Sequence, residues 1–111
     1  VLHVCGDTTR LVSAMGQVEV QGLSLDAMVD FVKAAPKIPS DMVLIGNLDP
    51  VRVMVNEPPD GVRMAVRQLL DDMAPFENFI LSTGCDLPFE TPLENIQAFM
   101  DEGRTYIPTQ L

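Results

Sequence analysis

The residues best suited to chemistry are one histidine and two cysteines, the only residues of their kinds in the chain. His3 and Cys5 lie two positions apart in the apolar stretch 1–6, and Cys85 follows a second apolar run at 79–81. Because residues i and i+2 of a β-strand point to the same face, the imidazole and one thiol would leave the first strand together. If the two apolar runs are neighbours in one sheet, all three side chains meet. One imidazole and two thiolates suit zinc and leave one position of a tetrahedron open.

A purely structural interpretation of the same residues stands beside the zinc hypothesis. A lone histidine in an apolar strand is more often a satisfied core residue, and a free cysteine is usually buried and inert. Two ligands with a distant third are also a weak zinc pattern. The residue types alone therefore favour the structural interpretation. Only further motifs can make the zinc hypothesis the stronger of the two.

Length and composition restrict the classes of protein that remain. The chain has 111 residues, enough for one domain, and its hydrophobic fraction of 47% is enough for a core. A net charge of −9 makes nucleic acid and anionic membranes poor partners. No signal peptide or membrane-spanning apolar run is visible. Two cysteines make no disulfide framework and would be thiols in a reducing compartment. We therefore expect a cytoplasmic protein.

Strand-like and helix-like segments alternate along the chain, and they must position the three side chains. Strands are expected at residues 1–5, within 18–25, at 41–47 and at 78–83. Helices are expected at residues 8–15, at 26–34, from 58 or 59 to 73, and from Thr91 onward. Four strands that are continuous apolar runs, each followed by a helix, favour a parallel sheet in an α/β fold.

Two helix starts and two apolar faces are predicted in more detail. Asp26 could cap the helix that follows it. Thr91 and Glu94, with Pro92 at the first helical position, form a capping box. The buried face of the long helix is predicted to consist of Val62, Val66, Leu69, Leu70 and Met73. That of the last helix is predicted to consist of Leu93, Ile96, Phe99 and Met100.

The polar residues gather where the strands end, which points to a barrel or an open α/β sheet. These residues are Cys5, Asp26, Asn47, Asp49 and Cys85. Both folds place their chemistry at the carboxyl ends of the strands. A complete (β/α)₈ barrel takes ~250 residues, so the chain supplies about half of one. It also begins without methionine, inside a strand-like run. We expect a fragment whose open edges require the missing N-terminal half or self-association.

Five short motifs resemble, in order, the C-terminal half of the uroporphyrinogen decarboxylase superfamily. They occupy residues 2–9, 22–26, 46–50, 81–88 and 91–96. The set is most similar to the branch of methylcobalamin:coenzyme M methyltransferases and related corrinoid-dependent methyltransferases. The motif at 46–50, Gly-Asn-Leu-Asp-Pro, is shared with true decarboxylases, whereas His-x-Cys with a distant Cys is not.

The resemblance implies a fold, a cofactor and a partner. Residues 1–111 would form a single fragment, the C-terminal half of a TIM-type (β/α)₈ barrel. His3, Cys5 and Cys85 would hold Zn²⁺, as the matching residues do in the methyltransferase branch. The enzyme would move a methyl group between a corrinoid (methylcobalamin), carried by a partner protein, and a small thiol such as coenzyme M. With the motifs included, the zinc hypothesis displaces the structural interpretation.

Thiol activation gives that zinc a chemical purpose. A thiol with a pKa near 8.5 is only a few per cent thiolate at neutral pH, and the thiolate is the nucleophile. Complete ionisation is worth at most ~30-fold in rate, or about 2 kcal/mol. Coordination also weakens the nucleophile, so the larger contribution should come from positioning the thiol against the methyl group.

The other polar residues each have two interpretations. Asp26 could be a fourth zinc ligand, displaced by the incoming thiol, or a helix cap. Asn47 could contact substrate or form part of a turn, whereas Asp49 is interpreted as a turn residue before proline. Gly84 is predicted to supply an unusual backbone angle. Asp86 could contact a zinc ligand without binding the metal itself, or it could face solvent.

Three alternative functions remain. A related methyltransferase could demethylate a methoxy or methylamine-type donor and pass the methyl group to a corrinoid protein. Porphyrinogen decarboxylation, a lyase reaction without metal in that family, is opposed by Cys85, because the decarboxylases carry a histidine near that place. The fragment alone could also be inactive.

Overall fold

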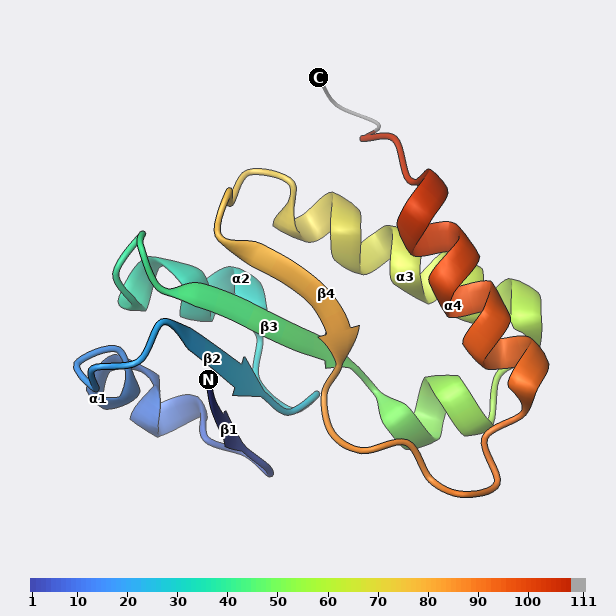
Figure 1. The fold of residues 1–111 in the computed structure, drawn as a ribbon, viewed down its shortest axis with the longest axis horizontal. Helices are drawn as coiled ribbons and strands as arrows, with labels where there is room; N and C mark the ends of the chain where they lie inside the picture. Colours follow the sequence, from blue (N-terminus) through green and yellow to red (C-terminus); the bar gives the residue numbers. More distant parts are fainter. Residues whose placement is uncertain (109–111) are drawn as a thin grey trace.

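The computed structural model of the protein describes residues 1–108, which form an α/β fold around one parallel sheet. Its strands are β1 (Leu2–Val4), β2 (Gly22–Leu25), β3 (Val43–Leu48) and β4 (Phe79–Thr83). They pair in the order β1-β2-β3-β4, every pair parallel, and all four arrows in Figure 1 point the same way. The parallel sheet predicted from the alternation of elements is confirmed. Within the described residues, β1 and β4 each pair along one side only.

Helical segments follow every strand. The segments are η1 (Thr9–Leu11), α1 (Val12–Met15), α2 (Phe31–Ala34), η2 (Ala35–Lys37), η3 (Pro50–Val55), α3 (Pro59–Met73) and α4 (Leu93–Thr105). The long helix begins and ends where the sequence predicts. No helix among residues 1–108 has both the length and the apolar character needed to cross a membrane.

Both predicted helix caps are wrong. Helix α2 is capped by Asp30, whose carboxylate accepts hydrogen bonds from the N–H groups of Val32 and Lys33. Asp26 lies earlier, in the loop between β2 and α2, so the helix is shorter than predicted. At α4 the residue before the first helical position is Pro92, and no side chain caps the helix. The Thr91 hydroxyl donates instead to the Pro88 carbonyl, 2.7 Å away, so the capping box does not form.

The two faces of the sheet differ. On one face Leu23, Leu25 and Leu44 are almost fully buried against side chains of the helices, among them Phe31 of α2 and Met73 of α3. In Figure 1 these two helices lie on the far side of the sheet. This face holds the larger of two hydrophobic clusters, which is the core that fixes the register of the strands.

The opposite face carries one row of side chains across all four strands. His3 pairs with Ser24, Ser24 with Ile45, and Ile45 with Ile80. His3 and Ile80, on the two edge strands, are exposed, and the two central residues are half-buried. Because no helix of the described residues covers this face, it corresponds to the interior of a barrel that these four strands do not close.

The predicted apolar face of α3 is confirmed. That of α4 is confirmed in part, because Ile96 and Phe99 pack against the core, but the buried face is rotated relative to the prediction. Val62, Val66 and Met73 of α3 are buried. In α4, Leu93 is 82% exposed and Met100 41% exposed, although both were assigned to the buried face. The residues of α4 that are buried instead are Asn95, Ala98 and Glu102.

Two polar contacts explain the rotation of α4. The side-chain amide of Asn95 donates to the carbonyls of Met54 and Glu57, at 2.9 and 2.8 Å. Glu102 accepts from the guanidinium of Arg67 on α3, with Nε–Oε1 at 2.9 Å. These bonds pull polar side chains into the α3–α4 contact and leave some apolar ones outside, which a pattern of hydrophobicity cannot indicate.

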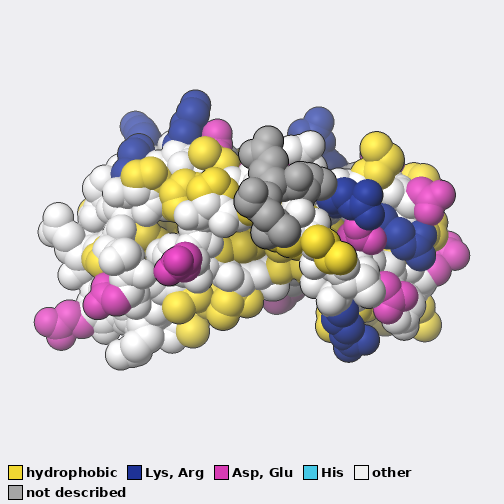
Figure 2. Space-filling view, turned by 90° about the horizontal axis from the view of Figure 1, so that it is seen from above, with side chains coloured by type: hydrophobic (Ala, Val, Ile, Leu, Met, Phe, Trp, Pro, Cys, Tyr) yellow, Lys and Arg dark blue, Asp and Glu magenta, His cyan; other side chains and the backbone are white. Residues whose placement is uncertain are grey.

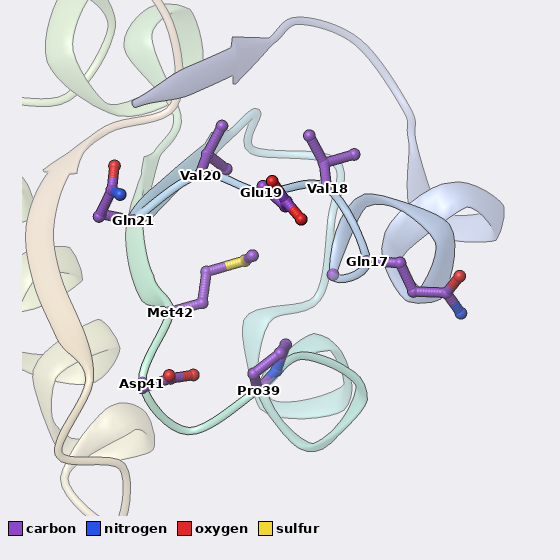
Figure 3. A pocket seen from close by; sticks show the side chains of 9 residues that line it. Gln17, Val18, Glu19, Val20, Gln21, Pro39, Asp41 and Met42 are labelled. Carbon is purple, nitrogen blue, oxygen red and sulfur yellow. The ribbon is translucent and has the colours of Figure 1, made fainter.

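A hollow lies at the amino ends of β2 and β3, far from the histidine and cysteines. Its volume is about 490 Å³, and the segments 16–21 and 39–42 line it. Met42 points into this hollow (Figure 3). Because the carboxyl ends of the strands carry chemistry in such folds, we assign it no catalytic role.

Candidate metal centre

Three donor atoms converge at the carboxyl end of the sheet. The Nε2 atom of His3 is 3.1 Å from the Sγ atom of Cys5, which is 2.9 Å from the Sγ atom of Cys85. All three donor atoms lie within 4.8 Å of one another. His3 and Cys5 are exposed and Cys85 is half-buried, so the cluster opens toward the uncovered face of the sheet.

The route by which Cys85 reaches the cluster differs from the simplest sequence argument. The strands that precede the cysteines are not neighbours, because β1 and β4 form opposite edges of the sheet. The loop after β4 crosses the ends of the two central strands instead. In this loop the N–H group of Gly84 donates to the carbonyl of Leu48, 2.8 Å away. The loop thereby carries Cys85 across the sheet to the end of β1.

Gly84 is required by close contact rather than by backbone angle. A Cβ atom on this residue would lie 2.6 Å from the backbone nitrogen of Ala27 and 3.1 Å from the carbonyl carbon of Asp26. The glycines with left-handed φ values among the described residues are Gly6, at +82°, and Gly46, at +143°. The predicted unusual angle at Gly84 is therefore wrong. The residue is small because two loops touch there.

The three side chains fit a zinc ion in type and spacing. Two thiolates and one neutral imidazole form a common zinc ligand set, with a fourth position left for a substrate. Sulfurs bound tetrahedrally at ~2.3 Å are about 3.8 Å apart, so the two sulfurs would have to separate by about 0.9 Å. Rotation about their Cα–Cβ bonds supplies such a movement in an exposed cluster. In the structure the two sulfurs are 2.9 Å apart and are joined by a hydrogen bond.

That hydrogen bond also shifts the pKa of one of the two thiols. The contact with Cys85 raises the pKa of the Cys5 thiol to about 11, with smaller contributions from desolvation and from the nearby carboxylates of Asp26 and Asp86. The raised pKa favours the neutral thiol form of Cys5 further. A metal ion that binds here must displace a proton, because the thiolate is the ligand.

Ser24 is the residue of the site that the sequence argument did not single out. Its Oγ atom is 2.8 Å from Nδ1 of His3, the ring nitrogen that faces away from the sulfurs. The two residues are directly paired on β1 and β2. The available signal was a serine between two leucines, because a strand whose leucines face the core must turn that serine to the other face.

Asp26 links the ends of two strands. Its carboxylate accepts a hydrogen bond from the N–H of Gly6 at 2.8 Å and another from the N–H of Ala27 at 2.7 Å. Each oxygen therefore already has a backbone donor. The role of Asp26 as a fourth zinc ligand stays a prediction, and the observed contacts give it a separate structural role beside Cys5.

Asn47 and Asp49 both contact backbone groups. The Asn47 amide nitrogen donates to the carbonyls of Asp26, at 3.0 Å, and Val29, at 2.6 Å. It therefore fastens the loop after β2 to the end of β3, and its contact with substrate stays a prediction. The Asp49 carboxylate accepts from two N–H groups at the start of η3, as expected of a turn residue.

A second hollow lies directly beside Cys85. It measures about 340 Å³ and is lined by Asp26, Ala27, Met28, Asp49, Pro50, Val51, Cys85 and Asp86. The polar part of the lining is acidic, and Met28 and Val51 add exposed apolar surface. The arrangement offers a small molecule a place next to one of the two sulfurs.

Comparison with known proteins gives three consistent results. The family model described as uroporphyrinogen decarboxylase (URO-D) matches residues 1–106. A methylcobamide:CoM methyltransferase, MtbA, from Methanosarcina acetivorans is 37% identical over 106 residues, which are 96% of this chain and 30% of the relative. A methylated-thiol–coenzyme M methyltransferase from Methanosarcina mazei is 30% identical over 100 residues, 90% of this chain and 26% of the relative.

A solved structure agrees with the fold. A methyltransferase from Methanosarcina mazei superposes with a TM-score of 0.79 at 24% identity, over 92% of this chain and 29% of that one. At this identity the likeness concerns the fold alone. The four strands of this chain correspond to part of a TIM-type barrel. The chain spans about 30% of the length of its curated relatives. The match of the family model over almost all of its residues shows that the chain belongs to the uroporphyrinogen decarboxylase family.

Proposed function

We propose that this chain is the zinc-binding part of a methyltransferase that moves a methyl group between a corrinoid and a thiol such as coenzyme M. The observation that carries the proposal is the convergence of His3, Cys5 and Cys85, with donor atoms within 4.8 Å of one another. The relatives, which include a methylcobamide:CoM methyltransferase, support the same chemistry.

In this proposal the three side chains bind a divalent ion and neutralise its charge. Zinc, when bound, would supply a Lewis acid that keeps a substrate thiol in its thiolate form at neutral pH. The two cysteine thiolates balance the charge of the ion, and the neutral His3 completes a three-ligand site with a free position. Two anionic sulfur donors leave more electron density on an incoming sulfur than imidazoles would, which favours its attack on a methyl group.

The hollow beside Cys85 is the proposed place of the thiol. Asp26, Asp49 and Asp86 in its lining would repel the sulfonate of coenzyme M. We infer that the substrate enters thiol first, with its anionic end pointing away from this part of the barrel. The positive groups that bind that end would come from parts of the barrel outside this chain, and so would the surface that receives the corrinoid protein. Asn47, at the end of β3, is the proposed contact to substrate from this chain.

A second candidate is demethylation of a methylated donor, with the methyl group passed to a corrinoid protein. The relative named methylated-thiol–coenzyme M methyltransferase favours it, because such an enzyme handles a methylated sulfur compound. The same three side chains would then hold a zinc ion that activates the leaving sulfur, so the site alone does not fix the direction of transfer. Decarboxylation gives the two thiols no task and is the weaker hypothesis.

The test is a methyl-transfer assay on the protein that carries this sequence within a complete barrel. Zinc-loaded protein is mixed with methylcobalamin and coenzyme M, and mass spectrometry follows methyl-coenzyme M. We expect product with the unmodified protein and a loss of at least ~100-fold with Cys85→Ser. A zinc-loaded protein that forms no product would overturn the first candidate. Product from a methylated thiol and reduced cobalamin would then support the second.

A further inference from the structure

The hydrogen bond between His3 and Ser24 has a consequence for which nitrogen of the ring can bind metal. Nδ1 of His3 is 2.8 Å from the Ser24 hydroxyl, whereas Nε2 is 3.1 Å from the Cys5 sulfur. A neutral imidazole carries its proton on one nitrogen and offers a lone pair on the other. Only the tautomer protonated at Nδ1 leaves the lone pair of Nε2, which lies on the side of the two sulfurs, free to bind a metal ion. In that tautomer the Nδ1–H donates to the Ser24 oxygen.

We propose that Ser24 is a positioning residue that holds His3 in the tautomer and ring orientation required for metal binding through Nε2. The proposal rests on the proposed metal site and deepens it. It concerns this chain's own residues on the two strands, and it needs no contact between Ser24 and the metal or the substrate.

The backbone makes this serine a fixed partner. Ser24 and His3 are paired across parallel strands, and the leucines on either side of Ser24 are 0% exposed. A shift of β2 by one residue would turn both leucines out of the core, so the register is strongly fixed. The hydroxyl therefore stays opposite the ring, whether or not a metal is bound.

A neutral partner also suits the charge of this site. Ligand histidines usually donate their second N–H to a carboxylate, a carbonyl or water. A carboxylate at position 24 would add a negative charge next to two thiolates and to Asp26. A serine hydroxyl accepts the same N–H without adding charge, so the cluster keeps a net charge near zero when a divalent ion is bound.

The test compares two substitutions of nearly equal shape. Ser24→Thr keeps the hydroxyl and Ser24→Val removes it, and both are β-branched residues that suit a strand. Cobalt(II) is the probe, because its visible spectrum reports the ligands and its affinity can be measured by titration. We expect Ser24→Thr to bind like the unmodified chain. We expect Ser24→Val to bind about 10-fold more weakly and with altered d–d bands.

A second readout distinguishes a loss of His3 positioning from a nonspecific disruption of the fold. ¹⁵N spectra of the metal-free imidazole should show the Nδ1–H tautomer with serine or threonine at position 24. With valine they should show a shift toward the Nε2–H form. Ser82→Ala is the control, because Ser82 lies on β4 opposite Asn47 and makes no side-chain hydrogen bond among the described residues. The control should leave both readouts unchanged.

Two results would count against the proposal, and they differ from failure of the metal site itself. If Ser24→Val kept the cobalt affinity, the spectrum and the tautomer of the unmodified chain, Ser24 would have no positioning role. Equal losses in Ser24→Val and Ser24→Thr would also overturn it, because the hydroxyl would then be irrelevant. If the unmodified chain bound no cobalt with sulfur-to-metal charge-transfer bands, the proposed function would fail before the role of Ser24 arose.

Discussion

The two sulfurs of the candidate site lie 2.9 Å apart and belong to the chain's only cysteines, so single-atom substitutions can test the site. We expect about one zinc per chain in the unmodified protein and far less in Cys5→Ser or Cys85→Ser, because a hydroxyl is a poor zinc ligand. Elemental analysis after dialysis against a weak chelator measures this. Ser82→Ala, on the same face of the sheet, should keep its zinc. Equal zinc in all four proteins would place the metal elsewhere.

The meeting of His3, Cys5 and Cys85 could be predicted from the sequence, but the route by which they meet could not. Their types alone favoured a structural interpretation, and the surrounding motifs, which indicated the family, moved the prediction to zinc. The crossing of the loop after β4 depends on tertiary contacts, which leave no local pattern in the sequence. The close approach of Gly84 to Ala27 leaves none either. A single serine in a strand likewise gives no sign that an imidazole lies beside it. Candidate ligand residues are thus easier to identify from the sequence than the tertiary contacts that orient them.

Among the elements, the loop after β4 should be the most sensitive to an added methyl group. A Cβ atom on Gly84 would lie 2.6 Å from a backbone nitrogen, and backbone cannot move aside as a side chain can. Gly84→Ala should therefore displace Cys85 and lower zinc affinity by about 10-fold or more, as loss of a supporting contact does in other zinc sites. Competition with a zinc chelator measures the change.

The matched control for that prediction is Gly103→Ala in α4. Its added methyl group would meet only the end of the flexible Leu81 side chain, at 2.9 Å. We expect zinc affinity to remain as in the unmodified chain. If both glycine variants lowered zinc affinity equally, the effect would come from general destabilisation and not from the position of Cys85.

The contact between α3 and α4 depends on a buried polar residue. Asn95 is 1% exposed, and its amide donates to two carbonyls in the segment before α3. Asn95→Ala should lower the free energy of unfolding by about 1–3 kcal/mol, because both carbonyls lose their partner. Urea denaturation measures the difference. Gln97→Ala, on the exposed side of the same helix, should change it by less than about 0.5 kcal/mol; equal effects would contradict this account of the helix orientation.

The helices show where sequence patterns succeed and where they fail. The boundaries and buried face of α3 were predictable because its apolar residues recur at one period and prolines precede it. The capping box at α4 was wrong because Pro92, and not Thr91, occupies the position before the first helical residue. The predicted buried face of α4 was right for Ile96 and Phe99 and wrong for Leu93 and Met100. It was partly wrong because Asn95 and Glu102 have hydrogen-bond partners inside the molecule. Pattern rules assume that polar residues face water, and these two do not.

At the scale of the whole molecule, the four strands form an open part of a barrel. One face of the sheet is uncovered, and β1 and β4 each leave an edge free within the described residues. Large hydrophobic side chains are exposed, including Ile80 at 53% and Leu93 at 82%. Figure 2 shows hydrophobic side chains at the surface among acidic and basic ones. We propose that residues 1–111 act as one unit that docks against the rest of a barrel, or against a second copy.

That proposal predicts association of the isolated chain. Analytical ultracentrifugation should give a mass above the 12.2 kDa of one chain. Ile80→Lys should reduce association, because a charge on an edge strand opposes pairing with another chain. Met64→Lys, which changes an apolar residue on α3 that is even more exposed, at 73%, should not. A monomer with both edges free, unaffected by either change, would contradict the docking proposal.

The parallel sheet was predictable from the alternation of strands and helices, whereas its strand order was not predicted. The uncovered face was predictable from length alone, because about half a barrel cannot close.

The most direct test of the central claim, that His3, Cys5 and Cys85 share one zinc ion, is X-ray absorption at the zinc edge of the loaded chain. The account predicts two sulfur neighbours at ~2.3 Å and a nitrogen neighbour at ~2.0 Å, with one sulfur fewer in Cys85→Ser. A zinc ion surrounded only by oxygen and nitrogen, or a sulfur count unchanged by that substitution, would contradict it.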